Sequence, residues 1–158
     1  MRKIDTLWAP IFLLMLATCA VAQLPIGEQI VEQTAKKDIE QVLHTQQDAW
    51  NRHDLEGFMA GYFQSPDLTF FSGAQEQHGW QATLERYRAR YAGPGHEMGE
   101  LEFSDLRIEM LGLNAAFVRG AWHLAMPLGK TPHGLFTLVF RRTTQGWKII
   151  HDHTSAAE

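Results

Sequence analysis

The chain has 158 residues, of which 45% are apolar and 20% are charged, and its formal net charge is −4. This length and composition predict one globular domain with its own core and exclude an intrinsically disordered chain. No stripe of lysine and arginine runs along the sequence, so nucleic acid is not an expected partner.

Residues 1–22 have the pattern of a secretory signal peptide. A positively charged start precedes a short apolar run over residues 11–17, and Ala22 ends a small-residue cleavage site. The run is shorter than the roughly 20 residues that a membrane-spanning helix needs. We therefore expect a periplasmic or secreted domain over residues 23–158 with no membrane anchor. A lipid anchor on Cys19 is the alternative.

Cys19 is the only cysteine, so the mature domain is expected to contain none. Disulfides, cysteine nucleophiles and cysteine-bound metals are therefore excluded for that domain. No glycine-rich phosphate loop follows an expected strand, and we expect no cofactor.

The first half of the domain predicts three helices. Apolar residues recur at three- and four-residue steps between residues 28 and 51, as in an amphipathic helix laid on another layer. Asp54 is a predicted N-cap for a second helix over residues 55–63. A third helix is predicted from about Gly79 to the Gly-Pro-Gly stop at residues 93–95, with its arginines mostly on the solvated side.

The second half predicts strands. Four long strands are expected there, at 101–111, 115–126, 135–142 and 147–154, and a short strand at residues 68–71 is expected earlier, between the second and third helices. Their short connections favour antiparallel neighbours. Helices followed by a strand meander indicate an α+β domain.

Alternation along the strands predicts which face each side chain occupies. In the last strand it places four side chains toward the helices: Trp147, Ile149, His151 and His153. Asp152 is expected to point the opposite way, unless a β-bulge inverts the alternation. The face away from the helices is still partly apolar, which predicts a homodimer that covers it.

Several local motifs resemble those of a known family. The stretch Ala49-Trp50-Asn51-Arg52-His53-Asp54-Leu55-Glu56-Gly57-Phe58 resembles the junction of the first two helices in SnoaL-like domains of the nuclear transport factor 2-like (ketosteroid isomerase-like) superfamily. Residues 146–155 resemble their last strand. The resemblance implies a cone-shaped fold, with three N-terminal helices on a curved, mainly antiparallel sheet around a deep pocket. The closing pattern W-x-x-x-H-x-H-x-S is also similar to the association domain of calcium/calmodulin-dependent kinase.

The candidate catalytic residues are His151, His153, Asp152 and Tyr62. An imidazole in a pocket can exchange a proton near neutral pH, and a buried aspartate can act as a base. The alternative is that both histidines bond neighbouring groups and fix the end of the strand. A further alternative is a metal ion bound by His151, His153 and His123. No carboxylate lies at a spacing typical of a metal ligand, so no metal site is expected.

Aromatic residues are expected to line the pocket, and the candidates are Trp50, Phe70, Trp80, Tyr87, Trp122, Phe136 and Trp147. The resulting hypothesis is an exported domain that binds a small apolar molecule and carries out acid–base chemistry of the isomerase or hydrolase kind. The alternative is a non-catalytic module that associates chains, because this fold alone does not determine function.

Overall fold

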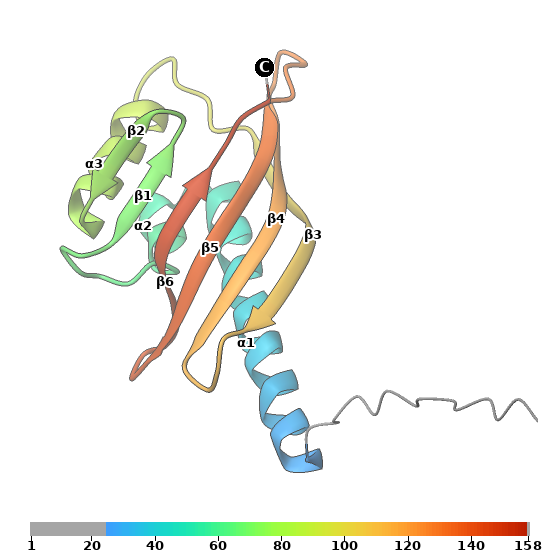
Figure 1. Cartoon of the computed structure of the whole chain (residues 1–158). Coiled ribbons are helices and arrows are strands. Elements are labelled where there is room, and N and C mark those ends of the chain that lie inside the picture. Colours follow the sequence, from blue (N-terminus) through green and yellow to red (C-terminus); the bar gives the residue numbers. More distant parts are fainter. Residues whose placement is uncertain (1–24, 158) are drawn as a thin grey trace, which may run out of the picture.

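A curved six-stranded sheet with helices against one face forms the described part of the protein, residues 25–157 of the computed structural model (Figure 1). The strand order is β2-β1-β6-β5-β4-β3, and β1 runs parallel to β6 while every other neighbouring pair is antiparallel. The elements are α1 (Ile26–Asn51), α2 (Leu55–Met59), β1 (Thr69–Ser72), β2 (Gln75–His78), α3 (Trp80–Tyr91), β3 (Glu100–Met110), β4 (Ala115–Ala125), β5 (His133–Thr143) and β6 (Gly146–Thr154). The α+β class is confirmed. The predicted signal peptide and Cys19 lie outside the described residues.

Helix α1 crosses the concave face of the sheet, and α2 and α3 lie beside β1 and β2 (Figure 1). The residues that α1 buries are Ala35, Ile39, Leu43, Gln46, Ala49 and Trp50. Its first turns extend past the end of the sheet. Ile30, which the spacing assigned to the packed face, is therefore 62% exposed. No helix within residues 25–157 is both long and apolar enough to cross a bilayer.

The second helix is shorter than predicted. Asp54 caps it as expected, because its Oδ1 accepts a 2.8 Å hydrogen bond from the amide of Gly57. The helix ends at Met59 because the next residues pair with β6. The amide of Phe63 donates to the carbonyl of Ile149, whose own amide donates to Gly61. This parallel bridge replaces the last helical turn.

Strand β2 was not predicted from the sequence. Its four residues, Gln-Glu-Gln-His, are polar and lie at the edge of the sheet, so they show no alternation of apolar and polar side chains. Strand β1 forms an antiparallel hairpin with β2 and joins the rest of the sheet through its parallel pairing with β6.

A β-bulge in β6 determines which residues face the helices. Val139 of β5 pairs with His151, while the next residue, Phe140, pairs with Ile149. Ile150 is therefore an extra residue, and it inverts the alternation for the remainder of β6. The inward direction predicted for His151 and His153 was wrong.

The residues after the bulge have the inverted orientation. Asp152 and Thr154 face the interior. Trp147 and Ile149 precede the bulge, and both are buried as predicted, with 3% and 1% exposure.

Candidate functional site

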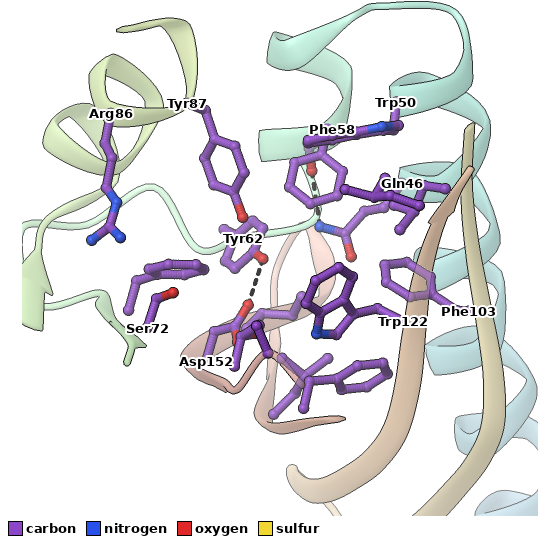
Figure 2. A pocket seen from close by; sticks show the side chains of 18 of the residues that line it. Gln46, Trp50, Phe58, Tyr62, Ser72, Arg86, Tyr87, Phe103, Trp122 and Asp152 are labelled. Carbon is purple, nitrogen blue, oxygen red and sulfur yellow. Dashed lines mark hydrogen bonds between the residues drawn. The ribbon is translucent and has the colours of Figure 1, made fainter. Parts of the chain in front are cut away.

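A cavity of about 400 Å³ lies between the helices and the concave face of the sheet (Figure 2). Its size falls within the range of small-molecule sites. Its aromatic lining residues are Trp50, Phe58, Tyr62, Phe70, Tyr87, Tyr91, Phe103, Trp122 and Phe136. The rings pack mainly edge to face, as Trp50 does with Phe58 and Tyr91. The walls therefore favour an apolar or aromatic occupant.

Five of the seven predicted pocket residues line this cavity: Trp50, Phe70, Tyr87, Trp122 and Phe136. Trp80 and Trp147 do not. The indole N–H of Trp80 donates a 2.8 Å hydrogen bond to the carbonyl of Met59, which ties α3 to the end of α2. Trp147 is buried in the core, where its Nε1 has no hydrogen-bond partner among residues 25–157.

Asp152 is a buried carboxyl group that faces the cavity. It is 4% exposed and accepts two hydrogen bonds, from the Tyr62 hydroxyl to Oδ2 at 2.7 Å and from the Thr154 hydroxyl to Oδ1 at 2.8 Å. Burial raises the pKa of Asp152 to about 6, because the charged form is desolvated. The two hydrogen bonds and the charge of His153 oppose this rise only in part. The group can therefore titrate near neutral pH.

Tyr62 reaches Asp152 because the segment after α2 is held against β6. The bridge between Tyr62 and Ile149 lies just before the bulge. Gly61 allows this close approach, since a Cβ atom there would lie 2.4 Å from Cδ of Gln46. Gln46 is buried itself, and its Nε2 donates a 2.9 Å hydrogen bond to the carbonyl of Phe58.

Two tyrosine hydroxyls share this part of the cavity. Burial is the largest cause that raises the pKa of both Tyr62 and Tyr87 well above the ordinary value, and the charge of Asp152 adds to it. Both hydroxyls therefore remain protonated and able to donate at neutral pH. Figure 2 shows both tyrosines and Asp152 pointing into the cavity, from three different parts of the chain.

His151 and His153 lie on the other face of the sheet and do not line the cavity. The His151 Nδ1 atom is 2.6 Å from the Thr69 hydroxyl, and its ring packs edge to face on Phe71 at 5.0 Å. Burial and the neighbouring His153 lower the pKa of His151. These contacts match the alternative in which the histidines hold β6 against β1. Within residues 25–157, no group of three histidine, cysteine, aspartate or glutamate side chains could hold a metal ion.

Sequence reasoning missed most of the polar residues that line the cavity, among them Ser72, Gln75, Thr154, Arg86 and Arg90. Thr154 shares the strand face predicted for Asp152, away from the helices, and only the bulge brings it inward. Arg86 and Arg90 were placed mostly on the solvated side of their helix. Arg86 is instead half-buried, while Arg90 is exposed as expected, and both line the cavity. Their four-residue spacing from each other, next to Tyr87 and Tyr91, is the signal that could have placed them there.

Comparisons with known proteins agree with this architecture. The model of the SnoaL-like domain family matches residues 39–158. An NTF-2 like protein of unknown function from Shewanella oneidensis MR-1 is 40% identical, with a TM-score of 0.71 over 76% of this chain and 98% of that one. An NTF2-like protein of unknown function from Pseudomonas putida KT2440 is 21% identical, with a TM-score of 0.67 over 79% and 88%. No curated protein was found to match the chain.

Proposed function

The chain belongs to the SnoaL-like domain family, and on that premise we propose that its cavity binds a small, mainly apolar molecule and performs acid–base chemistry through Asp152. The observation that carries the proposal is a buried carboxyl group, with a pKa of about 6, at the wall of an aromatic cavity of about 400 Å³. Shifted titrating groups in a cavity are characteristic of catalytic sites.

Asp152 has the properties of a general base. A group whose pKa is about 6 is mostly ionised at pH 7 but still accepts a proton readily. The hydrogen bonds from Tyr62 and Thr154 fix the orientation of the carboxylate. Each of its oxygens still has a lone pair for a substrate proton. His151 and His153, the first candidates for this role, face away from the cavity.

The reaction class that fits these groups is proton abstraction from a carbon beside a carbonyl. Asp152 would take the proton, and the negative charge would develop on the carbonyl oxygen of the substrate. The Tyr87 hydroxyl, which stays protonated, would donate to that oxygen. Asp152 would then return the proton to the enolate, either at the same carbon or at another one. Such a cycle needs no cofactor.

Exchange of carbon-bound protons tests this proposal. 2-Tetralone is a neutral bicyclic ketone, and exchange of its α-protons in D₂O can be followed by proton NMR. We expect the wild type to accelerate the exchange. The exchange rate constant of Asp152→Asn should be lower than that of the wild type by at least about 100-fold. Asp48→Asn, at an exposed site on α1, is the matched control. Equal rates for the wild type and Asp152→Asn would reject the role of Asp152.

Export is part of the same proposal. The pattern of residues 1–22 supports cleavage after Ala22 and a periplasmic or secreted domain. N-terminal sequencing of the protein from cells would test this. A mature chain that begins at Gln23 is expected, whereas a lipid-modified Cys19 would favour the anchored form.

A second candidate function is association of chains through the convex face of the sheet. The observation in its favour is the apolar surface there, where Leu135 is 65% exposed and Phe117, Val139 and Ile150 are half-buried. A second copy of the chain is the proposed occupant. Light scattering tests it: a dimer or larger ring supports association, and a monomer rejects it. The similarity to the kinase association domain stays a prediction.

A further inference from the structure

Three arginines project from α3, and they have different surroundings. Arg88 forms an ion pair with Glu56, away from the cavity. Arg86 and Arg90 line the cavity instead, one helical turn apart. Among residues 25–157, neither of these two guanidinium groups has a carboxylate within ion-pair distance. Two cationic groups, a half-buried Arg86 and an exposed Arg90, therefore line the cavity without an ion-pair partner among the described residues.

The Arg86 side chain lies against the Phe70 ring in the cavity lining. Its guanidinium carbon lies 5.6 Å from the centre of the Phe70 ring, and the residue is half-buried. Contact with an aromatic face leaves the N–H groups at the edge of the guanidinium available. Figure 2 shows Arg86 extending from α3 toward the same side of the cavity as Ser72, and both Ser72 and Gln75 line it as well.

Arg86 and Asp152 have opposite electrostatic effects on Tyr87, which lines the same cavity. The charge of Asp152 raises the pKa of Tyr87 and the charge of Arg86 lowers it, whereas the charge that lowers the pKa of Asp152 is that of His153. Within residues 25–157, Asp152 is the one acidic residue in the cavity lining, and it forms no ion pair with Arg86. The aromatic walls thus lie between a cationic rim and a carboxyl group that titrates near neutral pH.

We infer that Arg86, aided by Arg90, binds the carboxylate of the ligand, so that the substrate class is a small aromatic or apolar monocarboxylate. This inference rests on the proposed function of the same cavity. A planar guanidinium binds a carboxylate through two parallel hydrogen bonds, which suits the free edge of Arg86. Anchored at the rim, such a ligand extends its apolar part along the aromatic walls toward Asp152.

Two probes of matched shape test the inference. 2-Naphthoate and 2-naphthamide differ in charge and little in size, and binding of each at pH 7.5 can be followed through the fluorescence of Trp50 and Trp122, which line the cavity. We expect the wild type to bind naphthoate at least about tenfold more tightly than naphthamide. Arg86→Gln is expected to reduce that preference to less than about twofold. Arg88→Gln removes the same charge from the same helix outside the cavity and is expected to keep the preference.

The outcomes separate the inference from the proposed function. If naphthamide binds the wild type as tightly as naphthoate, the cavity binds small molecules but the carboxylate preference is rejected. If Arg86→Gln keeps the full preference, or Arg88→Gln loses it, the role of Arg86 is rejected. If neither probe binds, the proposed function fails and the inference fails with it.

Discussion

The hydroxyl group of Tyr62 donates a 2.7 Å hydrogen bond to Oδ2 of Asp152, a residue 90 positions later in the chain. Two features bring them together. The segment around Tyr62 pairs with Ile149 in parallel, and the bulge at Ile150 then turns Asp152 toward the cavity. Both partners are buried, so the bond lies where neither group has a competing contact with bulk water.

The stability of the protein should depend on the ionisation of Asp152. Its folded pKa of about 6 lies above the ordinary value of 3.8, so the folded state binds the proton more tightly than the unfolded state. The contribution of this group to the free energy of unfolding is then largest below about pH 4, and about 3 kcal/mol of it is lost as the pH rises through 6. In Asp152→Asn this loss should be absent, while Asp48→Asn should retain it. Urea unfolding between pH 3.5 and 8 measures the effect, and parallel curves for wild type and Asp152→Asn would contradict the assignment.

Removing the Tyr62 hydroxyl should raise the pKa of Asp152 further. The hydrogen bond from Tyr62 favours the ionised carboxylate and lowers its pKa, so Tyr62→Phe shifts the titration to higher pH. Carbon-13 NMR of the carboxyl group measures the shift directly. Tyr91→Phe is the matched control, because Tyr91 lines the same cavity and does not bond Asp152. An unchanged or lower pKa in Tyr62→Phe would contradict the contribution of this bond.

The two histidines of β6 should be dispensable for binding in the cavity. Because His151 and His153 lie on the opposite face, the double variant His151→Ala, His153→Ala should bind 2-naphthamide within about twofold of the wild type. The measurement is the same fluorescence titration. Circular dichroism must show an intact fold, since His151 also contacts Thr69 and Phe71. A large loss of affinity in a folded double variant would place the histidines in the site after all.

A side chain at Gly61 should destabilise the protein. In Gly61→Ala the new Cβ atom would overlap the buried side chain of Gln46, which is held by its bond to the Phe58 carbonyl. We expect a loss of roughly 1–3 kcal/mol in the free energy of unfolding, typical of overpacking. Gly27→Ala is the control, because open space surrounds that position in α1 and alanine favours a helix. Equal stability of Gly61→Ala and wild type would mean that Gln46 can move aside.

The sequence alone established the fold of this protein to a large extent. Periodicity predicted α1 and the long strands β3 to β6, because this signal repeats over many residues. Asp54 was predicted as an N-cap from its residue type and its position before an apolar stripe. The sequence also identified five of the aromatic residues that line the cavity, since large apolar side chains on the inner face of the sheet and on the packed faces of the helices are buried together.

The tertiary structure decided the chemistry of the site. One extra residue, Ile150, reverses every side chain after it, so Asp152 replaces the histidines in the cavity. A bulge depends on the pairing between two strands, and no pattern within the sequence of β6 predicts it. The pKa of Asp152 likewise depends on burial and on Tyr62, which arrives from another part of the chain. Local spacing can place a residue on a strand, but only the packed neighbours determine which way it faces and whether it holds a proton.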